Sequence, residues 1–317
     1  MKDKIYNIDS DSSLLEDLSN WIRLRSIGQK HIYQGEWAKV YYEDKSCNPM
    51  YIGETLVNAD FNNFINKNLS SYDNTTLISL WCWNSETEKY LYKNSDFDSI
   101  DFYWVDSSKA MLSLSIDNLK DISCNKTFIC SDFTKRKFRL ELHEMTKKYN
   151  ERIFAFFSNT FWNIQHTNII DILFNLLNKW DKIWLDVRLR KWTSVKDDFE
   201  LVNIIAKDIE RSETTINYTR VFKEMWIDVT KWELKMSSKK EHSINALKCN
   251  FCFQLNEKTK VSIKWDDITI LPWESIDLLR IYVYDPDGLI NFFNEHWFKL
   301  IDKQTKWYRG QFLFEKI

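Results

Sequence analysis

The sequence is short of glycine, of proline and of net charge. Its 317 residues include five glycines and three prolines, and 44 Lys and Arg residues face 46 Asp and Glu residues. Without a positive excess, the chain lacks the electrostatic footprint of a general nucleic-acid-binding protein. No apolar run approaches the ~20 residues that cross a bilayer, and no signal-peptide core follows the first residues. We therefore expect a cytoplasmic protein that binds a small molecule and neither nucleic acid nor a membrane.

Motifs for metal binding and for nucleophilic catalysis are also missing from the sequence. The six cysteines and five histidines form no set with ligand spacing, and Cys249-Asn-Phe-Cys252 has no second ligand pair for zinc. The alternation of Leu247, Cys249, Phe251 and Phe253 instead predicts a half-buried strand. Neither G-x-S-x-G nor H-E-x-x-H occurs. We expect no metal site.

Tryptophan, by contrast, is abundant. Fifteen tryptophans accompany the five glycines, whereas glycine alone makes up about 7% of an average chain. A genome rich in A and T would lower both counts, because the usual codons of both residues are rich in G. Glycine and tryptophan together make up about 6% of this chain, close to an ordinary glycine share. We therefore hypothesise that UGA codons, which a few bacterial lineages read as glycine, are recorded here as tryptophan.

The positions of several tryptophans fit this hypothesis, because glycine has backbone roles that tryptophan lacks. Trp226 and Trp297 follow helical patterns at the site of a C-cap glycine, and Trp273 follows Pro272 in a turn. The alternative is an ordinary tryptophan-rich protein whose indoles are packed or exposed. We expect glycine at most of these positions: Trp37, Trp81, Trp83, Trp162, Trp180, Trp226, Trp273 and Trp297.

From about residue 75, strand patterns alternate with helix patterns. This alternation predicts a parallel sheet with right-handed crossovers, and segments 298–302 and 311–315 indicate an antiparallel hairpin at the C-terminus. The predicted fold class is therefore α/β, a Rossmann-like doubly wound sheet with an antiparallel C-terminal hairpin and a smaller α+β lobe. The predicted parallel strands are 76–80, 100–105, 126–130, 152–157 and 182–187.

Candidate ligand-binding residues follow the first three predicted strands, where ligands of such sheets bind. The first strand runs into Leu80-Trp81-Cys82-Trp83-Asn84, which becomes a glycine-rich turn if both tryptophans are glycine. Asp106 ends the second strand, and its carboxylate can accept bonds from two ribose hydroxyls. Asp132 and Phe133 end the third strand, an acceptor for an exocyclic amine beside a ring that can stack on a purine. One Asp after a strand is usually a helix cap. Suitable residues at the ends of all three strands, however, indicate a nucleotide-containing ligand.

With these residues in view, the sequence resembles the class I S-adenosylmethionine-dependent methyltransferases. It is most similar to the family of the histidine-specific N-alpha-methyltransferase of ergothioneine biosynthesis. The resemblance runs from about Lys30 to the C-terminus and implies S-adenosyl-L-methionine as cofactor. The segments that carry it are Tyr33-Gln-Gly-Glu-Trp-Ala-Lys, Val105-Asp106-Ser-Ser-Lys-Ala-Met-Leu, Ser131-Asp132-Phe133 and Phe157-Ser-Asn-Thr-Phe-Trp162-Asn163.

The resemblance also implies residues on the cofactor and acceptor sides of the site. Ser158 belongs to the cofactor side, and Asn163 and Tyr51 to the acceptor side; the alternative role for Asn163 is to cap the next helix. The family's Glu and Ser that bind histidine correspond here to Leu279 and Ile281. An apolar pair cannot pair with an amine or imidazole, and burying such groups unpaired is costly. The resemblance therefore implies a small amine or amino-acid-like acceptor other than histidine.

The resemblance divides the chain into an N-terminal part of the substrate lobe (1–70), a methyltransferase core (71–195), an inserted substrate lobe (196–274) and C-terminal strands that complete the core (275–317). It implies a methyltransferase that needs no dedicated catalytic residue if the amine has a neutral form. One alternative is a catalytically silent, methyltransferase-like binding or scaffold protein, if Trp81, Trp83 and Trp162 are indoles that fill the cofactor site. A dehydrogenase-like enzyme is less favoured, because the three-glycine fingerprint is missing.

Overall fold

The computed structural model describes the chain in several stretches. They are residues 4–9, 11–24, 31, 63–64, 66–68, 74–94, 100–157, 160–163, 166–190, 200, 203, 222, 232–263, 266–306 and 309–317, with the backbone alone described at 11–15, 162–163 and 167. Among these residues, no helix has the length and apolar character of a membrane span.

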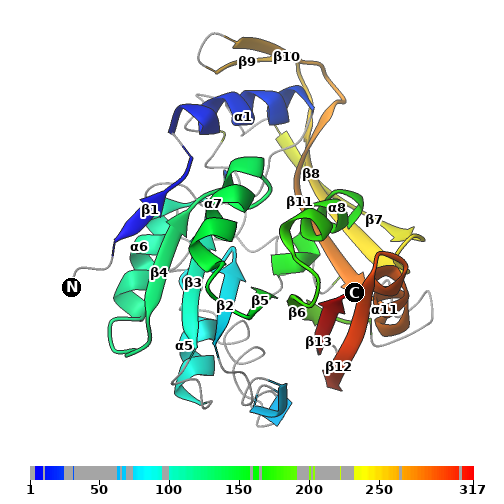
Figure 1. Cartoon of the computed structure of the whole chain (residues 1–317). Coiled ribbons are helices and arrows are strands. Elements are labelled where there is room, and N and C mark those ends of the chain that lie inside the picture. Colours follow the sequence, from blue (N-terminus) through cyan, green and yellow to red (C-terminus); the bar gives the residue numbers. More distant parts are fainter. Residues whose placement is uncertain are drawn as a thin grey trace.

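A mixed eight-stranded sheet forms the core (Figure 1). Its strands lie in the order β1 (Ile5–Asn7), β4 (Lys126–Cys130), β3 (Asp101–Asp106), β2 (Thr75–Leu80), β5 (Glu151–Phe156), β6 (Lys182–Arg188), β13 (Arg309–Lys316) and β12 (Phe298–Lys306). The first six are parallel to one another, and β13 runs antiparallel to both β6 and β12. From β2 the chain adds β3 and β4 on one side of β2, and then crosses over to add β5 and β6 on the other side of β2. The α/β, Rossmann-like doubly wound sheet with an antiparallel C-terminal hairpin is thereby confirmed.

Helices cover both faces of this sheet because alternate strand residues point to opposite sides. One face packs Phe102, Trp104 and Phe128 against α5 (Glu86–Lys93) and α6 (Lys109–Asn118). The other face packs Phe154 and Phe156 against α7 (Arg136–Thr146) and α8 (His166–Leu176). All six residues of β2 are buried, as expected for a central parallel strand.

A second, three-stranded antiparallel sheet has the order β11 (Ser275–Tyr284), β8 (Ala246–Leu255) and β7 (Trp232–Glu241). The hairpin of β9 (Thr259–Ile263) and β10 (Asp266–Ile270) extends from it, and α11 (Pro286–Glu295) leads back to β12. We expected segment 275–317 to complete the core. Instead β11 pairs with β8 along its whole length and belongs to the second sheet. Of this segment, only β12 and β13 are strands of the core sheet.

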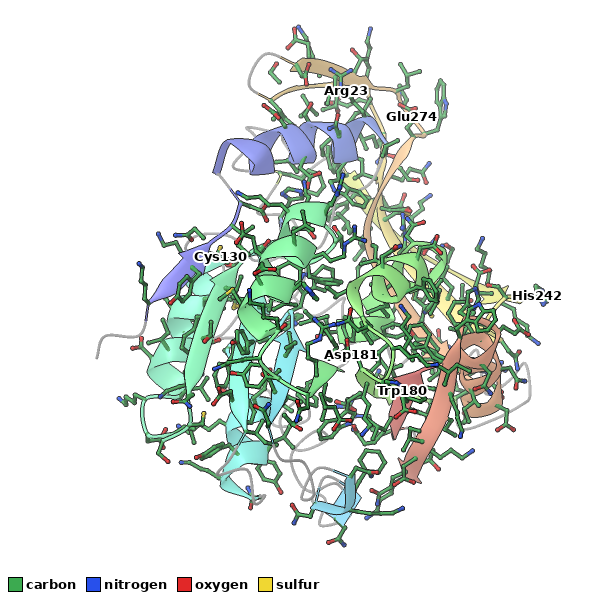
Figure 2. The ribbon with its side chains drawn as sticks, viewed as in Figure 1. Arg23, Cys130, Trp180, Asp181, His242 and Glu274 are labelled. Carbon is green, nitrogen blue, oxygen red and sulfur yellow. The ribbon has the colours of Figure 1, made fainter. Side chains whose placement is uncertain are left out.

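The N-terminal segment belongs to both parts of the fold, whereas we expected it in the substrate lobe alone. β1 pairs with β4 at the edge of the core sheet. Helix α1 (Asp11–Arg23) lies beyond the carboxyl ends of the core strands and next to the β9–β10 hairpin (Figure 1). Ser19 and Arg23 both bind Asp266 of β10, at 2.5 and 2.6 Å (Figure 2 labels Arg23 beside this hairpin). The segment thus connects the core to the hairpin.

Candidate functional site

The loop between β2 and α5 has an unusual backbone. Trp81, Trp83 and Ser85 have φ angles of 54°, 55° and 59°, all in the left-handed region. The Cys82 N–H donates to Val105 O at 3.2 Å, and the Ser85 N–H donates to Cys82 O at 2.9 Å. The loop is therefore bonded to the end of β3 and turns sharply into α5. Glycine is the residue that adopts such conformations without strain.

Asp106, at the carboxyl end of β3, lies directly beside this loop. Its carboxylate accepts from the Trp83 N–H at 3.2 Å and from the Ser108 N–H at 2.8 Å. Burial raises the pKa of the Asp106 carboxyl to about 7, and these main-chain donors oppose part of that rise. The Ser107 N–H is a third main-chain donor to this carboxylate. An ionised carboxylate has about four lone-pair sites, so some acceptor capacity remains for hydroxyl groups.

Glu88 lies beneath the loop and has no counterpart in the sequence predictions. It is buried on α5 and accepts a hydrogen bond from the Ser79 hydroxyl of β2. Burial raises the pKa of Glu88 to about 7; the Ser79 bond opposes this rise and the charge of Asp106 adds to it. Glu88 lies three residues before the buried Leu91, so both residues are on the inner face of α5. This spacing in the sequence could have identified Glu88 as a buried carboxylate.

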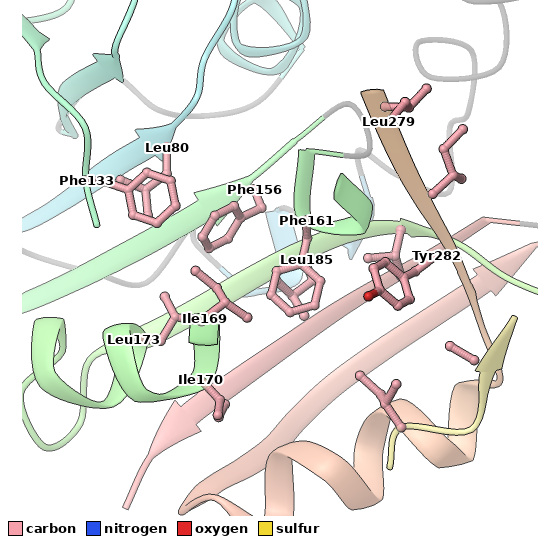
Figure 3. Packing of buried hydrophobic residues seen from close by; sticks show 14 of the residues in the cluster. Leu80, Phe133, Phe156, Phe161, Ile169, Ile170, Leu173, Leu185, Leu279 and Tyr282 are labelled. Atoms are coloured by element: carbon pink, nitrogen blue, oxygen red, sulfur yellow. The ribbon is translucent and has the colours of Figure 1, made fainter. Parts of the chain in front are cut away.

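Asp132 and Phe133 follow β4, as predicted, but the Phe133 ring does not offer an exposed face on which a purine could stack. Asp132 Oδ1 accepts from the Thr134 N–H at 3.0 Å and from its hydroxyl at 2.6 Å. The Phe133 ring is buried, with its centroid 5.7 Å from that of Phe156 (Figure 3). The Asp132 carboxylate therefore has a fixed orientation, whereas Phe133 is largely a core residue.

Asp9 reaches the same corner from the N-terminal segment. Its Oδ2 accepts from the Asp132 N–H at 2.7 Å and from the Ser131 hydroxyl at 2.9 Å. Sequence reasoning could not have found Asp9, because its position depends on the pairing of β1 with β4.

The indoles of Trp81 and Trp83 contact residues that follow β4 and β5. The Trp81 ring is 5.2 Å from the Phe133 ring in an edge-to-face contact, and the Trp83 indole N–H donates to the Thr160 hydroxyl at 3.2 Å. The Trp81 indole N–H is buried and has no hydrogen-bond partner among the described residues. Burying such a donor unpaired is unfavourable.

The acceptor-side predictions are placed only in part. Ser158 and Tyr51 lie outside the described residues, and Asn163 is described by its backbone alone, in the 3₁₀ helix η2 (Thr160–Asn163) after β5. Leu279 and Ile281 are buried on β11 opposite Phe251 and Cys249 of β8. Figure 3 shows Leu279 on β11, on the opposite side of the view from Phe133. The structure thus brings together residues 80–84, Asp106, Asp132 and Phe133, and leaves Leu279 on the second sheet.

His166 joins the core to the second sheet. Its Nε2 is 2.8 Å from the Tyr284 hydroxyl, which also donates to Phe161 O at 3.3 Å. Burial lowers the pKa of His166 to about 3, with a smaller contribution from Lys248. The imidazole is therefore neutral, and its contacts with Tyr282 and Tyr284 are those of a packed core ring.

No protein-family model and no curated protein match the sequence. Among solved structures, an S-adenosylmethionine-dependent methyltransferase from Clostridium acetobutylicum has 10% identity and a TM-score of 0.39 over 96% of this chain and 98% of that chain. A magnesium protoporphyrin IX methyltransferase from Synechocystis with bound SAH has 9% identity and a TM-score of 0.45 over 92% and 100%. An S-adenosylmethionine-dependent methyltransferase from Methanosarcina mazei has 10% identity and a TM-score of 0.42 over 82% and 98%. Each is a remote likeness of fold.

The residues present fit S-adenosylmethionine unequally. Asp106 and Asp132 supply carboxylate acceptors at the ends of β3 and β4, the chemistry that ribose hydroxyls and an exocyclic amine require. Trp81 and Trp83 do not fit, because a loop with this backbone brings its main chain to a ligand only when its side chains are absent. The nucleoside side of the site is therefore suitable, and the loop after β2 is not.

Proposed function

We propose that this protein is an S-adenosylmethionine-dependent methyltransferase that acts on a small amine or amino-acid-like acceptor. The observation that carries the proposal is the meeting of the left-handed loop, Asp106 and Asp132 at the carboxyl ends of three adjacent parallel strands. In doubly wound sheets, ligands bind at this edge near the switch point. The reversed β13 agrees with the antiparallel C-terminal hairpin that the strand pattern predicts.

The proposal includes glycine at positions 81 and 83 in the functional protein. Their φ angles of 54° and 55° are strained for tryptophan and ordinary for glycine. Removing the two indoles also removes the ring against Phe133 and the group bound to Thr160. The main chain of the loop is then free to approach the methionine portion of the cofactor.

The acceptor part of the proposal rests on the apolar character of β11 in the family register. Leu279 and Ile281 both pack into the apolar cluster of the second sheet. Neither side chain supplies a polar partner for an imidazole, and a site that recognises a group by hydrogen bonds loses most of its discrimination without them. We therefore propose an amine acceptor other than free histidine.

A silent binding or scaffold protein is the second candidate, and a specific observation favours it. With tryptophan at 81 and 83, the Trp81 indole packs on Phe133, a predicted cofactor residue, and the Trp83 indole is hydrogen-bonded to Thr160 after β5. On this interpretation the cofactor pocket has become part of the core.

Calorimetric titration with S-adenosylhomocysteine separates these candidates. The titration uses the chain as printed and the W81G/W83G variant, with folding of both verified by circular dichroism. Binding by the variant and none by the printed chain supports the methyltransferase with a glycine loop. A folded variant that binds no S-adenosylhomocysteine overturns the proposal and leaves the silent protein.

A further inference from the structure

The described tryptophans fall into two groups by backbone conformation. Among the described residues, eight that are not glycine have φ in the left-handed region, and five of these eight are tryptophan. The other three are Asn74, Asn245 and Ser85; asparagine enters this region more readily than most residues. For a bulky side chain the same conformation is an outlier, so five tryptophans among eight such residues require an explanation.

Trp273 occupies a turn whose geometry specifies glycine. The Glu274 N–H donates to Leu271 O at 3.2 Å, closing a four-residue turn with Pro272 and Trp273 in the middle. Proline at the second position and a φ of 66° at the third define a type II turn. Glycine is the usual residue at that third position. The Trp273 side chain is 74% exposed, so no packing compensates for the conformation.

Trp297 occupies the position that follows a helix C-cap. Helix α11 ends at Glu295 with His296 as its cap, and Trp297 then has a φ of 69°. Its N–H donates to Asn294 O at 3.3 Å, and its carbonyl accepts from the Ile317 N–H at 3.0 Å. Glycine is strongly preferred at this C′ position. The side chain is 63% exposed.

Trp180 repeats the pattern in the connection between α8 and β6. The Asp181 N–H donates to Asn178 O at 3.2 Å, and Trp180, at the third position of this turn, has a φ of 76°. Its side chain is 58% exposed (Figure 2 labels Trp180 and Asp181). Trp180, Trp273 and Trp297 thus share a glycine conformation and an exposed indole.

Among the other described tryptophans, three lie in strands and have buried side chains. Trp104, Trp184 and Trp232 lie in strands β3, β6 and β7, are buried, and have no left-handed φ. Trp104 stacks between Phe102 and Phe128 at 5.2 and 5.1 Å. The Trp184 indole N–H donates to Gln311 Oε1 at 2.7 Å in the core. In this second group the side chain has a packing role.

We infer that the tryptophans of this sequence come from two different codons. Positions 81, 83, 180, 273 and 297 are UGA codons that the native cell reads as glycine. Positions 104, 184 and 232 are ordinary tryptophan codons. The scarcity of glycine in the chain supports the same division. Positions 180, 273 and 297 lie in connections outside the proposed cofactor loop, so the inference stands on them independently of the proposed function. Of the remaining expected sites, Trp37 and Trp226 lie outside the described residues, and Trp162 lies within η2.

Peptide mass spectrometry of the protein purified from its native cells, together with the codons of its gene, tests the inference. The expected result is glycine and UGA at the five left-handed positions, and tryptophan and UGG at 104, 184 and 232. The second group is the internal control, because a uniform error would change all eight positions alike. Tryptophan in the native peptides that contain positions 180, 273 and 297 would overturn the inference. Glycine at these three positions without S-adenosylhomocysteine binding by the native protein would overturn the proposed function alone.

Discussion

The main-chain N–H of Trp83 donates a 3.2 Å hydrogen bond to the carboxylate of Asp106. This bond ties the loop after β2 to the end of β3, and it places the predicted ribose acceptor against the backbone that is proposed to face the cofactor. Asp106 thus holds the loop, and we propose that it also binds the ribose of the cofactor.

Replacement of Asp106 by alanine should weaken S-adenosylhomocysteine binding in the W81G/W83G chain by about 1.5–3 kcal/mol, the usual value of hydrogen bonds to a charged group. Calorimetry measures the change. Asp121→Asn is a suitable control, because Asp121 is paired with Lys89 and Lys93 outside the predicted cofactor residues. Equal affinities for the parent and the Asp106→Ala variant would contradict the assignment.

Replacement of Glu88 by glutamine should change the pH dependence of stability. The folded-state pKa of Glu88 is raised to about 7 by burial, above the unfolded value of about 4.3. The native state therefore holds this proton more strongly, and its contribution to stability, present at low pH, is lost as the pH rises through 7. Urea unfolding of the parent should show stability falling between about pH 4.3 and pH 7 and levelling off above that, by on the order of 4 kcal/mol for this group. In the Glu88→Gln variant, the free energy of unfolding should change less with pH over this range. The same pH dependence in both proteins would show that the folded-state pKa of Glu88 is not raised.

Replacement of Asp9 by alanine should destabilise the chain by about 1–3 kcal/mol, because the Asp132 N–H and the Ser131 hydroxyl lose their shared acceptor. Asp9→Asn keeps a side-chain carbonyl oxygen and should cost less. Lys137→Ala is the matched control, since the Lys137 ammonium binds Ile8 O on the same segment. Similar midpoints of unfolding for Asp9→Ala and Lys137→Ala would argue against a specific role for the carboxylate.

Replacement of Trp273 by glycine should raise stability by about 0.5–1 kcal/mol. Relief of a left-handed bulky residue contributes ~1–2 kcal/mol, and the extra freedom of glycine in the unfolded chain offsets about 0.4–1 kcal/mol. Thermal unfolding should therefore show a higher Tm. Trp184→Gly should act in the opposite sense, because it removes a buried side chain and the bond to Gln311. A lower Tm for Trp273→Gly would count against glycine at this turn.

Free histidine should not be the preferred acceptor of the W81G/W83G chain. The measurement is S-adenosylhomocysteine formation from S-adenosylmethionine across a panel of amino acids and amines, with Asp106→Ala as the inactive control. If histidine is clearly the best acceptor, the register that aligns Leu279 and Ile281 with the family's polar pair is wrong.

The core of the fold was accessible from sequence because its parallel strands are short apolar runs separated by strong helix signals. The predicted strand 126–130 has the observed bounds, and the other core strands differ by a few residues at their ends. The left-handed positions were accessible for a similar reason, since Pro272-Trp273 and a tryptophan after α11 stand at glycine sites in local sequence. These features depend on neighbours in the chain.

Features that depend on long-range pairing were missed. β1 is three residues long and exists because β4 offers an open edge, so Asp9 could not be connected to Asp132 from sequence. The pairing of β11 with β8 likewise decides that Leu279 and Ile281 share a face with Phe251 and Cys249. Phe133 was predicted as a stacking ring, and only its packing on Phe156 shows how deeply it is buried.

The central claim, a cofactor site opened by glycine after β2, is tested most directly on the protein as its own cells make it. Titration of this native protein with S-adenosylhomocysteine should show saturable binding to one site per chain, while the recombinant chain with tryptophan at 81 and 83 should show none. A native protein that carries glycine at both positions and still fails to bind would contradict the claim.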